Sequence, residues 1–140
     1  MTLYNLYIFN SKGECICYKE WRRENKREIT QEGEFKLIYG LILSLRSFAQ
    51  RISTKDGQQY IKFFTTSGYK MNYMETATGL KFVLNSDPDA IGIPELLRSI
   101  YSIFVETVVK NPLVTTESTI ESQLFHSRLD SIVKSHHSFV

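Results

Sequence analysis

The sequence predicts a three-layer α+β sandwich whose elements follow the order ββαβββαα. Two observations predict the strands: segments of strand-type pattern form two groups, within residues 3–21 and 58–86, and short turn sequences separate the members of each group. A third predicts the layers, because one long amphipathic helix lies between the groups and two more helices follow them. In this order one helix can cover one face of the sheet and two can cover the other. At 140 residues and 42% hydrophobic content, we expect a single domain over residues 1–140.

The first two strands form a hairpin. Leu3–Phe9 is almost continuously apolar or aromatic, which is typical of a strand buried on both faces. Turn residues follow at 10–13, and the second strand runs over Glu14–Trp21. Cys15 and Cys17 lie in this strand, so alternation predicts that both thiols point to the same face. We expect both to be unpaired, as in a reducing compartment.

The first helix begins after Thr30, whose hydroxyl side chain suits an N-cap. Glu32 and Glu34 follow in the first turn, where the helix dipole favours acids, and the helix runs to about Ile52.

Three strands come next, over Gln58–Thr65, Tyr69–Glu75 and Leu80–Ser86, and glycine-containing turns predict an antiparallel meander. Pro94 then suits the first position of a second helix that ends at Lys110. A capping-box pattern at Ser118 predicts a third helix that continues towards His136.

The first helix carries more apolar surface than one sheet needs. On a helical wheel the apolar arc spans about 160°, whereas a stripe of about 100° or somewhat more covers a sheet. The arc comprises Phe35, Leu37, Ile38, Leu41, Ile42, Leu45, Phe48, Ala49 and Ile52. Beside it lie three small residues, Gly40, Ser44 and Ser47, at the spacing i, i+4 and i+7.

These residues predict a docking surface for another protein. We assign it to Leu37, Gly40, Leu41, Ser44 and Phe48. The alternative is that the wide arc reaches from the sheet into a groove between loops, and that Gly40 merely weakens the helix by about 1 kcal/mol relative to alanine. The pattern alone leaves both interpretations open.

Composition and motifs exclude several classes of function. A net charge of +2 argues against a nucleic-acid partner. The Walker, dinucleotide-binding, zinc-helix and nucleophile-elbow motifs are all missing, so we expect no catalytic residue, metal or cofactor. Residues 87–98 imitate an EF-hand loop but end on Arg98 where a glutamate is required. Neither a signal peptide nor a membrane-spanning run is evident, so we expect a cytoplasmic protein with peripheral membrane contact only.

The hairpin over residues 69–85 resembles a known family. Its Glu75-Thr76, Thr78-Gly79, Lys81 and Asn85 resemble the central hairpin of the small sedlin-type, or longin-like (SNARE-like), subunits of the TRAPP vesicle-tethering complex. Further similar segments run through most of the chain: Asn5-Leu6-Tyr7, Phe9, Trp21, Lys36-Leu37, Tyr39-Gly40, Ser44, Arg46-Ser47-Phe48, residues 108–113 and residues 125–130.

The resemblance implies a five-stranded antiparallel sheet with one helix on one face and two on the other. It also implies partners, namely other small subunits of longin-like and Bet-three type. Together they form a guanine-nucleotide exchange factor for a Rab GTPase in endoplasmic reticulum to Golgi transport, located peripherally at cis-Golgi and endoplasmic reticulum membranes. The exchange surface in that family is shared among subunits, so the resemblance implies a non-catalytic scaffold. Palmitate binding belongs to a different subunit type, and we expect no bound lipid.

Two alternatives stay open. A small adaptor-type coat subunit has a similar length and a related longin fold. A profilin-like or PAS-like sensor would need a ligand pocket, for which Tyr60, Phe63, Phe64, Tyr69 and Tyr73 are candidates, although aromatic residues on strands are more often core. A longin SNARE would need a heptad segment and a membrane tail after the domain, and we do not expect one in a chain that ends at Val140.

Overall fold

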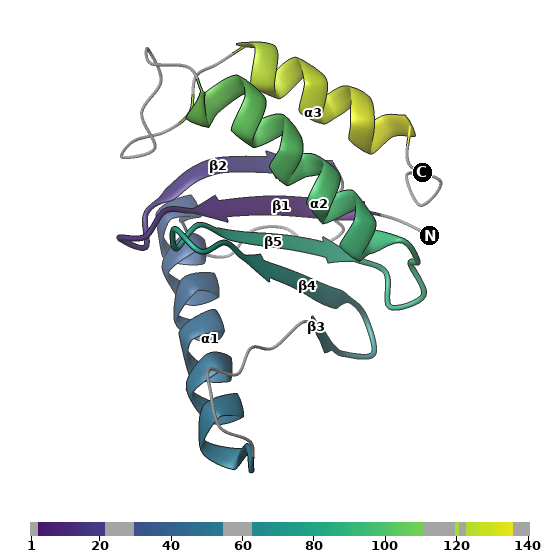
Figure 1. Cartoon of the computed structure of the whole chain (residues 1–140). Helices are drawn as coiled ribbons and strands as arrows, with labels where there is room; N and C mark the ends of the chain where they lie inside the picture. The colour runs from purple at the N-terminus through teal and green to yellow at the C-terminus, as the bar shows by residue number, and fades with distance from the viewer. Residues whose placement is uncertain (1–2, 22–29, 55–62, 111–119, 121–122, 136–140) are drawn as a thin grey trace.

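A computed structural model describes residues 3–21, 30–54, 63–110, 120 and 123–135, and its strands form one antiparallel sheet (Figure 1). The strand order is β2-β1-β5-β4-β3. The strands are β1 (Leu3–Phe9), β2 (Cys15–Glu20), β3 (Phe63–Thr65), β4 (Lys70–Glu75) and β5 (Lys81–Ser86). The two strand groups meet where β1 pairs with β5, from Leu3 opposite Ser86 to Phe9 opposite Lys81. The predicted five-stranded antiparallel sheet is therefore confirmed.

The helices occupy both faces of this sheet. Figure 1 shows α2 (Ile93–Phe104) and α3 (Gln123–Ser135) over one face and α1 (Gln31–Ile52) at the other. The three-layer arrangement and the order ββαβββαα are thus as predicted.

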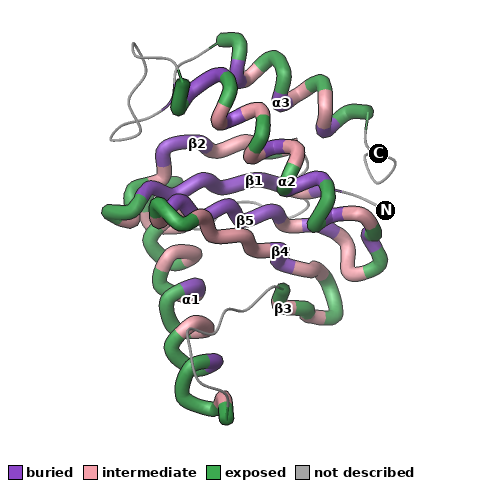
Figure 2. The backbone as a smooth tube through the Cα atoms, viewed as in Figure 1, coloured by how far each residue is buried: buried purple, intermediate pink, exposed green. Residues whose placement is uncertain are grey.

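Each face of the sheet carries its own hydrophobic cluster. The upper cluster lies under α2 and α3, where Phe104 packs edge-on against Phe82 at 5.6 Å and against Phe125 at 5.7 Å between ring centroids. The lower cluster lies on the α1 side and consists of buried Tyr7, Phe9, Ile42, Met71 and Val83 together with the half-buried side chains packed against them. Because β1 and β5 supply side chains to both clusters, they are buried along most of their length (Figure 2). This explains the nearly continuous apolar sequence of β1.

A bulge in β2 separates the two thiols, and the prediction that they share a face is wrong. The pairing slips between Ile8 and Phe9, which lie opposite Cys17 and Cys15, so Ile16 is an extra residue on its strand. Cys15 packs against the lower cluster and Cys17 belongs to the upper one. Both are free thiols, and burial raises the pKa of Cys15 to about 11 and that of Cys17 to about 12.

The helix ends follow the sequence signals in part. Thr30 caps α1, because its Oγ1 accepts a hydrogen bond from the Gly33 N–H at 3.1 Å. Pro94 lies in the first turn of α2, at its second residue and so one position later than predicted. The α-helical part of α2 stops at Phe104, however, and a π-helical turn, η1 (Val105–Val109), continues it.

The π-helical turn at the end of α2 differs from the prediction of a regular helix up to Lys110. The Thr107 hydroxyl donates to the Ile103 carbonyl at 2.7 Å, and the Lys110 N–H reaches back five residues to the Val105 carbonyl. The predicted start of the third helix at Ser118 lies outside the described residues, as do residues 58–62 of the predicted third strand and the position His136.

Candidate docking surface on the first helix

The first half of α1 is held to the sheet by aromatic packing. Phe35 meets Tyr7 edge-on, with ring centroids 5.9 Å apart, and Tyr39 packs on Phe9 at 5.5 Å. The α1 members of the lower cluster end at Leu45, whereas the helix continues to Ile52. The end of the helix, after Arg46, therefore projects past the sheet (Figure 1).

An apolar stripe along α1 has no cover in the described structure. Leu37, Phe48 and Ile52 are 65%, 57% and 63% exposed, and Leu41 between them is half-buried against the lower cluster. These four side chains lie at i, i+4, i+11 and i+15, which places them on one side of the helix. We call this set the exposed stripe, and much of the projecting helix is exposed in Figure 2.

The small residues lie next to the stripe. Gly40, Ser44 and Ser47 are all exposed. A Cβ atom added at Gly40 would meet no atom of the described residues within 4 Å apart from the backbone of α1 itself, so packing against them does not require glycine there. Of the five residues predicted for docking, Leu37, Gly40, Ser44 and Phe48 are thus open to solvent, and Leu41 is shared with the core.

Exposure also bears on the alternative interpretation of the wide arc. Leu37 and Phe48 are both more than half exposed, so no groove in the described part of the chain encloses them. Contact with a partner at these two residues stays a prediction.

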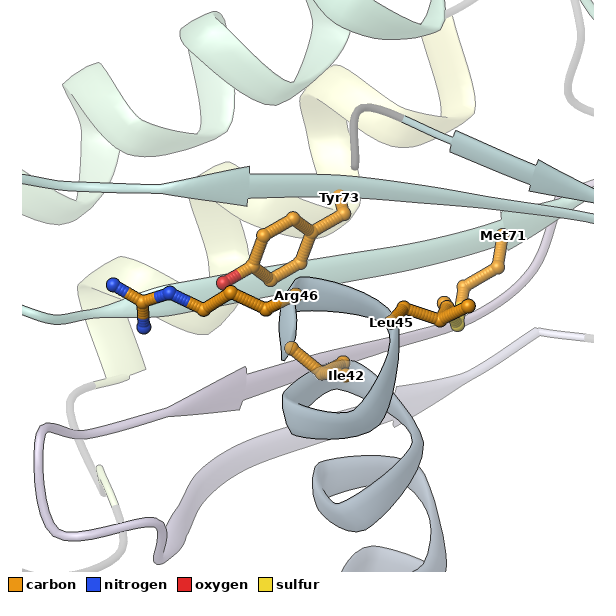
Figure 3. Close-up of a pocket in the computed structure, with 5 residues that line it drawn as sticks. All are labelled: Ile42, Leu45, Arg46, Met71 and Tyr73. Carbon is orange, nitrogen blue, oxygen red and sulfur yellow. The ribbon is translucent and has the colours of Figure 1, made fainter. Parts of the chain in front are cut away.

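A shallow hollow opens between α1 and β4. It is partly open to solvent, leaves about 10 Å³ of space for the centre of a water molecule, and is lined by Ile42, Leu45, Arg46, Met71 and Tyr73 (Figure 3). Ligand pockets usually enclose about 300 Å³ or more. The hollow therefore gives no support to the sensor alternative.

The aromatic residues proposed for a sensor pocket are dispersed. Phe63 is 56% exposed, whereas Phe64, Tyr69 and Tyr73 pack against the lower cluster. Tyr60 lies outside the described residues.

The structure reveals an ionic cluster between α1 and the β4–β5 hairpin, which the sequence did not predict. Oε1 of Glu75 lies 3.2 Å from Nη1 of Arg46 and 3.8 Å from Nζ of Lys81, and Oε2 accepts a hydrogen bond from the Tyr73 hydroxyl at 3.0 Å. Lys81 is only 4% exposed. The signal that could have found this pair is the hairpin itself, because residues equidistant from its turn face each other across the strands.

Other candidate chemistry is sparse among the described residues. They contain no group of three or more His, Cys, Asp and Glu side chains that could hold a metal ion. Asp87, the first residue of the EF-hand-like sequence, accepts a hydrogen bond from the Tyr4 hydroxyl. None of the described helices has the length and hydropathy needed to cross a bilayer.

Comparison with known proteins supports the resemblance seen in the hairpin. The model of the Sybindin-like family matches residues 3–136. Trafficking protein particle complex subunit 1 of Homo sapiens is 46% identical over 136 residues, which cover 96% of this chain and 94% of that protein. The protein of the same name from Dictyostelium discoideum is 37% identical over 140 residues, covering 98% of each chain.

Two other relatives widen the comparison. Transport protein particle subunit bet5 of Schizosaccharomyces pombe is 31% identical over 152 residues, covering 96% of this chain and 97% of that protein. Trafficking protein particle complex subunit 4 of Bos taurus is 33% identical over 93 residues, covering 66% of this chain and 42% of that protein. The residues of the hairpin over 69–85 resemble subunit one of the complex most, and the relatives of that name confirm this resemblance. The chain belongs to the Sybindin-like family.

Proposed function

We propose that this chain is a non-catalytic core subunit of the TRAPP vesicle-tethering complex. Near-full-length similarity to proteins named as subunit 1 of the trafficking particle supports the assignment. The observation that carries the scaffolding role is the exposed stripe on α1, since exposed apolar residues gathered on one surface mark contact surfaces.

The partner we propose for the stripe is another small longin-like subunit, docked on Leu37, Gly40, Leu41, Ser44 and Phe48. Similarity supports a partner of like fold, because chains related to this one carry the names of two subunits of one particle, 1 and 4. Gly40 and Ser44 would let the partner's backbone come close, while Leu37 and Phe48 supply the apolar contact area. Subunits of the Bet-three type would contact other parts of the surface.

Through the assembled complex, the chain would contribute to a composite exchange surface for a Rab GTPase in transport from the endoplasmic reticulum to the Golgi. Nucleotide exchange requires a surface that binds the nucleotide-free conformation of the GTPase best. It requires no acid, base or nucleophile from this chain. The chain would act in the cytoplasm and peripherally at cis-Golgi and endoplasmic reticulum membranes.

The test is purification of the tagged chain from cytosol at moderate salt, followed by mass spectrometry and a Rab nucleotide-exchange assay. We expect other small TRAPP subunits and exchange activity to co-purify. Recovery of a coat complex, or of the chain alone, would refute the proposal.

Substitutions locate the docking surface. Gly40→Leu and Ser44→Arg should each reduce co-purification of the neighbouring subunit, because both fill the space that a partner backbone would need. Ser131→Arg makes the same chemical change at an exposed position of α3 and should leave assembly unchanged. Normal assembly of both α1 variants would show that the partner binds elsewhere.

A further inference from the structure

The apolar contacts of α1 do not by themselves fix its rotation about its own axis. Its apolar arc spans about 160°, which is wider than the stripe of about 100° that covers a sheet. Hydrophobic contact is also non-directional. Turning the helix by some tens of degrees would therefore exchange one set of apolar side chains at the sheet for another. The direction in which the exposed stripe points must be fixed by something more specific.

The ionic cluster supplies directional contacts. Glu75 and Lys81 lie directly opposite each other in the β4–β5 register, so the hairpin fixes the positions of both charges. The side chains are 10% and 5% exposed. Nζ of Lys81 also donates to the Gly79 carbonyl at 3.1 Å, which ties it to the turn.

Two α1 residues reach this cluster from the same side of the helix. Nη1 of Arg46 lies 3.2 Å from Oε1 of Glu75, and Nζ of Lys81 lies 5.6 Å from the centre of the Tyr39 ring. The two residues are seven positions apart, which is two helical turns. Contacts at both points constrain rotation and tilt together, which one contact would not do.

We propose that Glu75 and Lys81 lock α1 in one orientation through Arg46 and Tyr39, and so aim the exposed stripe away from the sheet. Glu75 and Lys81 neutralise each other within the hairpin, so losing Arg46 leaves no buried charge without an opposite charge. The lock can therefore be opened without unfolding the hairpin.

The test measures the distance between spin labels on α1 and on the opposite layer, using the full-length chain without partners. The labels go on Arg51→Cys, in the last turn of α1, and Ser102→Cys, in α2, both at exposed positions. Cys17 is buried and Cys15 is half-buried, and the raised pKa of each thiol keeps it protonated at neutral pH, which favours labelling at the two introduced cysteines. The parent protein should give one narrow distance distribution.

Two variants and one control complete the design. Arg46→Met should shift and broaden the distribution with unchanged far-ultraviolet circular dichroism. Glu75→Gln combined with Lys81→Met, which removes both buried charges together, should do the same. Arg128→Gln breaks the exposed ion pair with Glu106 at 3.2 Å and should leave the distribution unchanged. A distribution that stays narrow in both cluster variants would overturn the lock.

The consequence for assembly rests on the proposed function and is measured separately. Arg46→Met should weaken co-purification of the neighbouring subunit although it leaves the exposed stripe intact. If the distances broaden while the parent chain recruits no subunit, the proposed function fails and the lock stands. If the parent chain assembles and the distances stay narrow in both variants, the lock fails and the proposed function stands.

Discussion

Replacing Gly40 should separate the stability of this chain from its assembly. Gly40 lies in the interior of α1, it is exposed, and among the described residues an added Cβ would meet no atom outside the helix backbone within 4 Å. Glycine in a helix interior costs about 1 kcal/mol relative to alanine, and leucine is nearly as favourable as alanine. Gly40→Ala and Gly40→Leu should therefore each raise the free energy of unfolding by up to about 1 kcal/mol, because the position is exposed and the added Cβ has space among the described residues.

The two variants differ in what they present to a partner. Alanine adds one methyl group, whereas leucine adds a branched side chain in the space through which a neighbouring backbone would approach. We expect urea unfolding to show both variants stabilised, with melting temperatures raised by about 3–5 °C for a domain of this length. We expect co-purification of the neighbouring subunit to fall for Gly40→Leu and to change much less for Gly40→Ala.

Stability and assembly each have a result that would contradict these expectations. A destabilised Gly40→Ala would mean that the backbone or surroundings of residue 40 need glycine, contrary to the open space around it. A stabilised Gly40→Leu that still assembles normally would remove Gly40 from the docking surface. A loss of assembly by an unstable variant would support neither conclusion, so stability is measured first.

Three further changes test the fold. Gly13→Ala should lower the free energy of unfolding by about 1–3 kcal/mol, because Gly13 has φ +85° and an added Cβ would lie 2.7 Å from the Tyr39 ring; an unchanged urea midpoint would contradict this. Thr30→Ala should cost about 1 kcal/mol through loss of the N-cap, with a matched fall in the melting temperature. The raised pKa values of Cys15 and Cys17, about 11 and about 12, should make stability fall as pH rises above the ordinary thiol pKa of 9.0, since the unfolded chain then loses protons that the folded chain keeps. Each thiol should contribute a slope of about 1.4 kcal/mol per pH unit between its two pKa values, and replacing both by alanine should abolish this part of the pH dependence.

Local sequence patterns predicted the elements whose cause is local. The continuous apolar run of β1 follows from burial on both faces, and Thr30 caps α1 through a hydrogen bond that spans three residues. The glycine of the β4–β5 turn, Gly79, has φ +89°, the conformation for which a hairpin selects glycine. Such features depend on neighbours within a few positions, so a single sequence contains enough information to find them.

Features that depend on pairing between distant segments were missed. The extra residue Ile16 in β2 arises from the register with β1, and it sends Cys15 and Cys17 to opposite faces of the sheet. A period of two counted along one strand cannot detect it. One local feature was missed as well: the π-helical turn after Phe104 depends on a choice between carbonyls four and five residues back, which side-chain periodicity does not resolve.

The docking residues show the same difference between what local sequence predicts and what distant contacts decide. The sequence identified surplus apolar surface on α1, and the structure shows which part is surplus: Ile42 and Ala49 are buried, whereas Leu37, Phe48 and Ile52 are exposed. The wheel could not make this choice, because it contains no information about where the sheet lies. Arg46 was equally invisible as a determinant, since its partner Glu75 lies 29 residues away.

The wide apolar arc of α1 explains why an ionic cluster is needed to fix the orientation of the helix. A helix with a narrow apolar stripe is oriented by burial alone, because any other rotation would expose apolar and bury polar side chains. A helix that must bury one apolar side and present another loses that specification, and a second, directional determinant is then needed. Burying charge is costly, and a well-packed apolar replacement is often at least as stable. Stability alone therefore gives little reason for Lys81 and Glu75 to lie between α1 and the sheet. A requirement that α1 present its exposed stripe in one direction does give a reason, and it predicts that an apolar replacement of the cluster can keep the fold while losing the partner.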